Sequence, residues 1–323
     1  MPTTQIPRGA DTKLFLKKQA SFKTPATGDY LTTVAYSDGI TETQSPAKNP
    51  LLGLNKNNTR DMTSRAPGLS SGAKGALVVP LCFSHMRYWL ELLLGAPVTT
   101  GTDPDFVHTF NSGGVALPEA TIETQQARNG GTLFWQKTGI MLDKMTIQAS
   151  RQEGFQRVTF DCVGYGVDAL TATGAGTPVD MVPLEQFAAA LPVYKMDGVA
   201  LGRLLDFTFT YANNLSLRDE IGDARPGGFD IDEAECTATM KVRLTDKTLW
   251  DAATAGTPHA GELLFQKSAS RLLSLAMPIV TMEKPQVTTE GPGFIDVSYS
   301  LYAEQSDSAP ALTATLKSGQ ETF

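Results

Sequence analysis

The sequence contains the same series of short blocks twice, in the same order. An Asn-Asn pair, an Arg-Asp pair and a Pro-Gly pair are followed by an alternating run, a Trp, a glycine and finally a Gly-Phe block. The matching stretches are 57–68 with 213–227, 77–95 with 238–256, and 154–160 with 293–299. Repeats in a fixed order indicate two copies of one structural unit.

A chain of 323 residues is long enough for two domains, each with its own core. The stretch around 171–192 is rich in Gly, Ala, Thr and Pro and has no sustained period, as is typical of a linker. We therefore expect a first domain at 1–175 and a second at 195–323, joined by a linker at 176–194. The first domain should carry an N-terminal arm and a long polar loop at about 37–75.

The clearest segments alternate between apolar and polar residues with a period of two, which predicts antiparallel strands with one packed face. They lie at 157–162, 205–211, 235–244 and 295–301. Each unit also contains one short amphipathic segment, for which Ser84 and Thr245 are candidate N-caps and Gly95 and Gly256 candidate ends. The predicted fold is mainly β: two tandem β-sandwich or barrel domains, each with one short flanking helix.

Each predicted helix contains one tryptophan, Trp89 in the first unit and Trp250 in the second. We expect both to anchor their helices to the core. The three cysteines (Cys82, Cys162 and Cys236) fall in strand-like runs and are expected to be small core residues.

Motifs for catalysis, metal binding or cofactor binding are not evident, so we expect neither an enzyme nor a cofactor. The three histidines are scattered and lack zinc spacing, and the acidic run at 230–235 lacks the pattern of a calcium loop. The stretch Gly68-Leu69-Ser70-Ser71-Gly72 matches G-x-S-x-G. A nucleophile elbow needs a buried strand before the motif and a helix after it, whereas a strand-like run follows here.

The net charge is −7 and is unevenly shared, at +1 for residues 1–180 and −8 for residues 181–323. An acidic surface disfavours tight binding to nucleic acid but suits a surface past which DNA slides. The first residues lack the apolar run of a signal peptide, and no stretch is apolar for long enough to span a membrane. We expect a soluble protein that is made in a reducing cytoplasm.

The repeated Arg-Asp pairs, Arg60-Asp61 and Arg218-Asp219, occupy equivalent places in the two units. Together with Arg65 and Arg225 they are candidates for inter-subunit contacts or for anchoring a loop. The alternative interpretation is that they are ordinary surface turn residues.

The doubled unit, the His108-Thr109-Phe110 segment with the strand-like run at 119–125, and the segment 207–214 resemble the major tail tube proteins of long-tailed bacteriophages. The resemblance covers about residues 13–305. It implies β-sandwich domains whose strands join between subunits into a barrel around a pore. Two domains per chain imply a trimeric, pseudo-hexameric ring, and the loop at 37–75 corresponds to one that reaches the adjacent ring.

The resemblance also implies the partners and the location of the protein. Rings would stack into the virion tail, assembled in the cytoplasm of the bacterial host, and phage DNA would pass through without specific binding. Expected partners are further copies of the chain, the tape measure inside the tube, the tail terminator and the distal tail protein, with no membrane partner. Another tail protein, either a tail terminator or a sheathed-tail tube subunit, or a carbohydrate-binding β-sandwich, remains an alternative.

Overall fold

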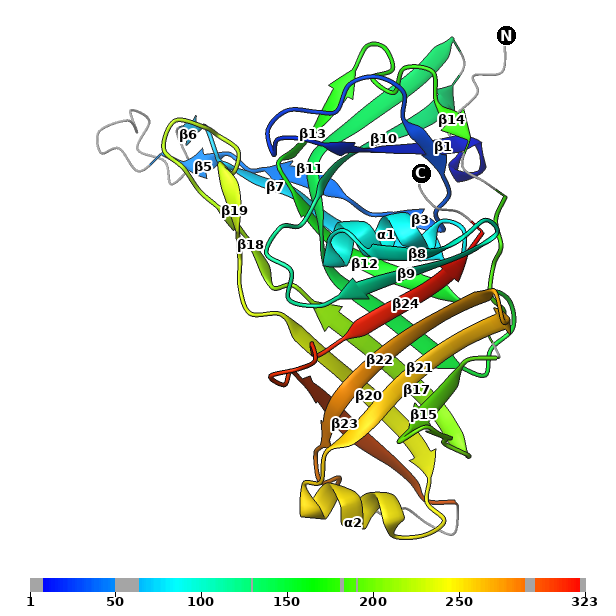
Figure 1. Cartoon of the computed structure of the whole chain (residues 1–323). Coiled ribbons are helices and arrows are strands. Elements are labelled where there is room, and N and C mark those ends of the chain that lie inside the picture. Colours follow the sequence, from blue (N-terminus) through cyan, green and yellow to red (C-terminus); the bar gives the residue numbers. More distant parts are fainter. Residues whose placement is uncertain are drawn as a thin grey trace.

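The structure is a computed structural model that describes residues 8–49, 64–128, 130–180, 183–189, 191–287 and 294–319. These residues form 24 strands, two α-helices and one 3₁₀ helix, so the predicted mainly-β fold with two short helices is confirmed. Twenty of the strands are linked by hydrogen bonds into one sheet that runs through the whole molecule (Figure 1).

We call the described residues up to 180 the first half, those from 191 onward the second half, and residues 183–189 the connecting segment. The elements of the first half are η1 (Gly9–Asp11), β1 (Thr12–Gln19), β2 (Leu31–Thr33), β3 (Ser37–Asp38), β4 (Thr41–Gln44), β5 (Ala47–Lys48), β6 (Arg65–Ala66), β7 (Ser70–Pro80), α1 (Met86–Leu94), β8 (Val98–Thr102), β9 (Asp105–Asn111), β10 (Glu119–Arg128), β11 (Gly131–Ser150), β12 (Arg157–Gly164), β13 (Gly166–Leu170) and β14 (Val179–Asp180). Those of the second half are β15 (Val193–Met196), β16 (Val199–Ala200), β17 (Leu204–Ala212), β18 (Leu215–Arg218), β19 (Gly228–Ile231), β20 (Glu235–Arg243), α2 (Thr248–Ala255), β21 (His259–Ser268), β22 (Arg271–Met282), β23 (Asp296–Glu304) and β24 (Thr313–Ser318).

The same set of antiparallel strand pairs occurs in both halves. The pairs β1–β10, β4–β7, β7–β12, β10–β11, β11–β12 and β11–β13 are matched by β15–β21, β17–β20, β20–β23, β21–β22, β22–β23 and β22–β24. The hairpin β8–β9 is an addition to the first half, and β9 pairs with β24 of the second half.

A central sheet in the order β7-β12-β11-β17-β20-β23 crosses from one half to the other. The crossing is made by the last residues of β11, which pair with β17 from Lys144 opposite Ala212 to Ser150 opposite Asp206. One face of this sheet is apolar and buried, as the period of two predicts, and its residues belong to a core cluster shared by both halves. The alternation is clearest in β20, where every second side chain is buried.

The two helices lie in different surroundings. All nine residues of α1 are buried, because the helix packs between β9 and β11. In α2 only Ala253 is buried, and the helix lies at the end of the molecule remote from α1 (Figure 1). Neither described helix is long and apolar enough to cross a membrane.

The predicted helix ends are confirmed, but the predicted N-caps are wrong. Gly95 and Gly256 follow α1 and α2 with φ of 90° and 63°, values that a residue with a side chain rarely adopts. The helices begin later than expected, after His85 and Lys247, and neither of these makes a side-chain cap. The hydroxyl of Ser84 does not cap the helix but donates to the carbonyl of Pro183 at 2.9 Å.

Two segments expected to be irregular are more ordered than their composition indicates. Both described ends of the predicted loop at 37–75 form strands, because β3 and β4 each pair with β7. β3 and β4 carry polar residues on both faces, so the period of two is missing there. The predicted linker at 176–194 contributes β14 and the connecting segment, in which Phe187 is only 2% exposed.

Candidate assembly surfaces

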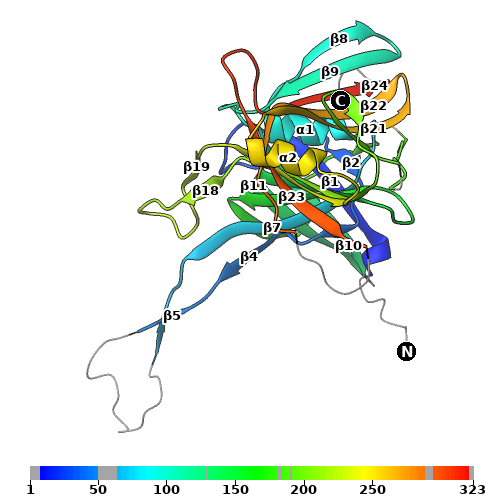
Figure 2. The same ribbon diagram turned by 90° about the horizontal axis from the view of Figure 1, so that it is seen from below.

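A long arm projects from the body of the molecule. It consists of β4, β5, β6 and the start of β7, and it extends well beyond the rest of the chain when the molecule is seen from below (Figure 2). The shorter hairpin β18–β19 leaves the second half on the same side (Figure 1). The loop at the tip of this hairpin touches the arm, since the amide of Ser70 donates to the carbonyl of Ala224 at 2.8 Å.

Arg225 joins these two projections. Its Nε and Nη2 each donate to a different oxygen of Glu42, both at 2.9 Å, and Nη2 and Nη1 donate to Asp168 at 2.9 and 3.2 Å. The guanidinium carbon also lies 5.3 Å from the centre of the Tyr165 ring. Planar forks of this kind are among the strongest hydrogen-bonded ion pairs in proteins. Arg225 therefore fastens β4, at the base of the arm, to the second half.

Glu42 is held in its ionised form by its surroundings. Burial alone would raise the pKa of its carboxyl, but hydrogen bonds from Arg225, the Ser70 hydroxyl and the Val167 amide outweigh that effect. The pKa of Glu42 therefore lies below its ordinary value, so the contact with Arg225 persists at neutral pH. The serine of the G-x-S-x-G stretch is Ser70, which begins β7, and its hydroxyl donates to the carboxylate of Glu42. It does not lie on a strand-to-helix turn.

A second ion pair lies at β3, the strand that precedes β4 in the chain. The ammonium of Lys137, only 4% exposed, contacts the carboxylate of Asp38 and donates to the Thr124 hydroxyl at 3.0 Å. Burial lowers the pKa of Lys137, and Asp38 opposes that shift. A cleft of about 550 Å³ separates this pair from the Arg225 cluster. Two charged contacts therefore hold the base of the arm, one on each side of the buried Ile40.

The other predicted site residues occupy different positions. Arg218 is exposed and pairs with Glu220 and Asp230 at 3.1 and 3.0 Å, contacts that stay within its own hairpin region. Asp219 is exposed just after β18, and Arg65 is exposed on β6 opposite Lys48. Arg60 and Asp61 lie outside the described residues. Among the predicted residues that the structure describes, only Arg225 joins the two halves.

The two tryptophans also differ. Trp89 is 1% exposed and stacks on Phe160 with the ring centres 5.7 Å apart. Trp250 is only partly buried, and the ammonium of Lys284 lies 4.9 Å from the centre of its ring. Trp89 is thus a core residue, whereas Trp250 lies at a surface.

The second face of the central sheet is polar and accessible. It is rich in hydroxyl groups, which come from Thr146, Thr159, Thr208, Thr210, Thr237, Thr239, Ser298 and Ser300. Three cations on this face have a carboxylate partner: Lys144 lies 2.7 Å from Asp161, and Asp296 receives both Arg243 at 3.1 Å and Lys241 at 3.9 Å. The guanidinium of Arg157 lies 4.2 Å from the centre of the Tyr36 ring, and Lys74 is exposed on β7. The face therefore offers hydrogen-bonding groups, and most of its cations have a partner.

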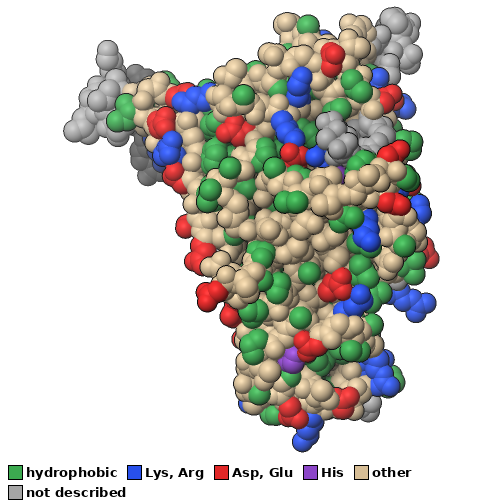
Figure 3. Space-filling view, viewed as in Figure 1, with side chains coloured by type: hydrophobic (Ala, Val, Ile, Leu, Met, Phe, Trp, Pro, Cys, Tyr) green, Lys and Arg blue, Asp and Glu red, His purple; other side chains and the backbone are tan. Residues whose placement is uncertain are grey.

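Acidic side chains gather along one edge of the molecule, beneath the arm (Figure 3). The predicted acidic turn lies at the end of β19 and the start of β20. Within the described ranges no three His, Cys, Asp or Glu side chains are placed to hold a metal ion. The three cysteines are free and buried there.

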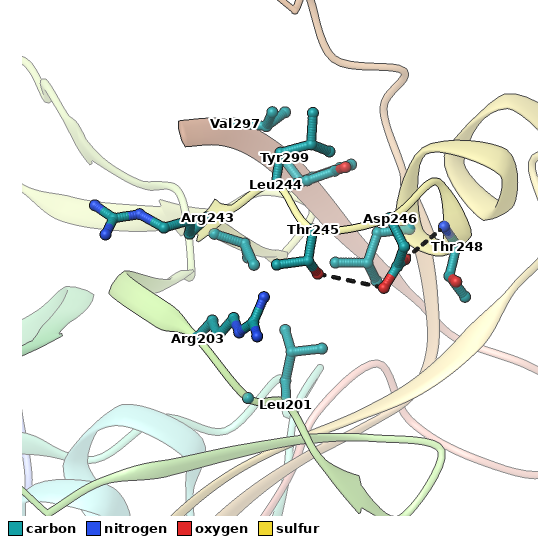
Figure 4. A pocket seen from close by; sticks show the side chains of 12 residues that line it. Leu201, Arg203, Arg243, Leu244, Thr245, Asp246, Thr248, Val297 and Tyr299 are labelled. Carbon is teal, nitrogen blue, oxygen red and sulfur yellow. Dashed lines mark hydrogen bonds between the residues drawn. The ribbon is translucent and has the colours of Figure 1, made fainter. Parts of the chain in front are cut away.

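An open pocket of about 670 Å³ lies at the α2 end of the second half (Figure 4). Its wall comes from the turn before β17, the end of β20 and the start of α2, and its floor from Val297 and Tyr299 of β23. The floor belongs to the shared core, so this opening leads to apolar side chains.

Two comparisons with known proteins bear on these surfaces. Residues 9–303 match the sequence model of a family described as "Phage tail tube protein". The search of curated proteins gives no match. The family match spans both halves, the connecting segment and the arm.

Proposed function

Because the chain belongs to the phage tail tube protein family, a family of structural proteins and not of enzymes, we propose that it is the major subunit of a tail tube. Three copies close into a pseudo-hexameric ring, with one tandem-duplicated tube domain in each half of every chain. Stacked rings then form the channel through which phage DNA is delivered.

The observation that carries this proposal is the central sheet, which passes through both halves and is open at both ends. At one end β3 and β4 pair with β7 and with no other described strand. At the other end, residues 283–287 continue from β22, and the amide of Glu283 donates to the carbonyl of Ser300 at 2.9 Å. Open edges of this kind favour pairing with another chain.

The internal junction between β11 and β17 provides a template for the contact between copies. In the matched strand pairs, β17 corresponds to β4, and the end of β11 corresponds to residues 283–287. A ring closes when residues 283–287 of one copy lie beside β3 and β4 of the next. Each contact is head-to-tail, so it generates a closed ring if the rotation returns to the starting copy.

The polar face of the central sheet would then line the channel. Threonine and serine hydroxyls exchange readily with water, and most cations on this face already lie beside a carboxylate or an aromatic ring. Tight binding of DNA depends on cations that neutralise phosphates. A hydroxyl-rich lining therefore suits DNA that must slide through without specific binding.

The arm would reach the adjacent ring, with Arg225 and Glu42 fixing its direction. Arg60, Asp61, Arg65, Arg218 and Asp219 would lie in contacts between copies or rings. Replacing both Arg60 and Arg218 by alanine should then block tube growth, whereas Arg128→Ala, at the exposed end of β10, should not. Normal tubes from the double variant would remove these residues from the assembly contacts.

Other tail proteins complete the proposed setting, which is a virion tail assembled in the cytoplasm of the bacterial host. The tape measure would occupy the tube during assembly, and the terminator and distal tail protein would cap its ends.

Electron microscopy of the purified protein tests the proposal. We expect tubes, or rings with a central channel, that contain only this chain. Single rings that never stack would favour a tail terminator. A monomer at every concentration, with affinity for glycans, would contradict the proposal and favour a carbohydrate-binding module.

A further inference from the structure

The connecting segment occupies a slot at the end of the first half. It lies between the residues that follow β7 and those that precede β12. The amide of Phe83 donates to the carbonyl of Glu185 at 3.1 Å, and the amide of Gln156 donates to that of Phe187 at 2.8 Å. Cys82 and Gln186 are partners in an isolated β-bridge. The segment is therefore held as a short extra strand.

Two side chains of the connecting segment fix it in this slot. The ring of Phe187 packs edge-on against Phe83 and Phe265, with ring centres 6.0 and 5.3 Å apart. The Gln186 amide donates to the Tyr36 hydroxyl at 3.4 Å, just before β3. The slot is thus bounded by the end of β7, the start of α1, β12 and the residues before β3.

The open pocket of the second half has the matching boundaries. It lies at the end of β20, the start of α2, β23 and the residues before β17, and these elements correspond to β7, α1, β12 and β3–β4. In the strand register its residues Leu244 and Tyr299 take the places of Leu81 and Phe160, since the amide of Leu244 donates to the carbonyl of Ile295 as that of Leu81 donates to the carbonyl of Gln156, both at 2.9 Å. No described segment fills this pocket as the connecting segment fills the first slot. Figure 4 shows the side chains that line it.

The sequence contains a second version of the segment that fills the first slot. Pro183-Leu184-Glu185-Gln186-Phe187 has the pattern Pro-x-x-Gln-apolar, and Pro2-Thr3-Thr4-Gln5-Ile6 repeats it. The placement is also repeated. Phe187 precedes the first strand of its half, β15, by the same number of residues that separates Ile6 from β1.

The chain that carries this second version enters the fold far from the open pocket. The first described residues and α2 lie at opposite ends of the molecule (Figure 1). Seven extended residues reach only about 25 Å, so a second copy is the natural source of the missing strand. In a ring, the second half of one copy is followed by the first half of the next, just as the connecting segment links the two halves within a chain.

We propose that residues 2–6 of one copy fill the open pocket of its neighbour as a short strand, with Ile6 in the position that Phe187 takes in the first half. This inference rests on the proposed ring and adds a second contact to it. The pocket recognises an extended segment with proline first, glutamine fourth and an apolar residue fifth. The contact locks adjacent copies together at the rim of the ring.

Cysteine cross-linking tests the contact in the assembled full-length chain. In the strand register Thr245 takes the place of Cys82, and Gln5 matches Gln186 in the repeated pattern. Partners in a β-bridge are close enough for a disulfide. The double variant Gln5→Cys with Thr245→Cys should give covalent oligomers up to the trimer under oxidation. Gln5→Cys with Lys267→Cys, which pairs the same cysteine with an exposed residue of β21, should not. Rings that form without this cross-link, or a bond within one chain, would overturn the inference and leave the proposed function intact.

A peptide-binding measurement tests the strand contact separately from the proposed tube function. A fluorescent peptide of residues 2–9 should bind the full chain saturably, below the concentration at which it assembles. Peptides with Ile6→Asp should bind at least about tenfold more weakly, because a charge would enter an apolar site. Thr3→Asp is the matched control, since its counterpart Leu184 is 42% exposed, and it should change affinity by less than about twofold. Equal affinity of all three peptides, or no binding, would overturn the inference even if the chain formed no rings.

Discussion

The two halves contain the same strand pairs, but they differ in how the helix and the slot beside it are covered. In the first half, α1 is buried on every side, and the slot beside it is filled by the connecting segment. In the second half, α2 buries one residue, and the matching pocket is open. The hairpin β8–β9 explains part of the difference, because it covers α1 and has no equivalent over α2 among the described residues.

The difference shows that one structural unit can be complete or incomplete, depending on what the rest of the chain lays over it. The first half obtains its covering strands from its own chain. In the second half no described segment takes their place, which is the expected condition of a unit whose neighbour is another molecule. Each prediction below would sharpen this contrast or break it.

The largest contrast should be between the two helix tryptophans. Trp89→Ala removes a buried ring stacked on Phe160 and should lower the free energy of unfolding by about 4 kcal/mol. Trp250→Ala should cost about 1 kcal/mol in the unassembled chain, since the ring is partly exposed. Denaturant unfolding of both variants measures the difference. Equal losses would mean that α2 is as well covered as α1.

The connecting segment should stabilise the first half through one side chain. Phe187→Ala should lower the free energy of unfolding by about 3 kcal/mol, because it leaves a cavity between Phe83 and Phe265. Leu184→Ala in the same segment should have little effect, since Leu184 is exposed. A small loss at Phe187 would show that the segment is a passive linker.

The arginine at the base of the arm should matter more than the one in the hairpin. Arg225→Ala leaves the partly buried carboxylate of Glu42 without its fork and should cost about 2 kcal/mol. It should also speed proteolysis of the arm. Arg218→Ala should leave stability unchanged, because its ion pairs are exposed. The reverse ranking would contradict the assignment of Arg225 as the anchor.

The smallest expected effect is a pH dependence. The pKa of Glu42 is lower in the folded chain than in the unfolded chain, where it is about 4.3. Its stabilising contribution is therefore complete above about pH 5 and is lost as the pH falls through the lower pKa of the folded chain. Glu42→Gln should show a shallower loss of stability than the parent between pH 5 and 3. Parallel profiles would show that Glu42 does not titrate with folding.

Much of the fold could be predicted from the sequence because its strands have one apolar face. The buried faces of β12, β17, β20 and β23 follow the alternation directly. The arm could not be predicted as strands, because β4 has polar residues on both faces. The helix starts were misplaced because Ser84 bonds to the connecting segment, a contact between residues distant in sequence.

Only some residues of the candidate sites could be predicted from the sequence. The repeated blocks pointed to Arg225, but its partners Glu42 and Asp168 lie in unrelated segments, so no local pattern marks them. The buried pair of Lys137 and Asp38 was missed for the same reason. Phe187 carried a usable signal, because the Pro-x-x-Gln-apolar pattern occurs twice, but its meaning depends on knowing that the first copy fills a slot.

A three-dimensional reconstruction of the assembled tube by electron microscopy tests the central claim most directly, since it counts the chains in a ring. We predict three chains per ring, with six similar β units around the channel and a strand from the neighbouring copy in the pocket beside α2. Six chains per ring, or a pocket left empty in a closed ring, would contradict the account.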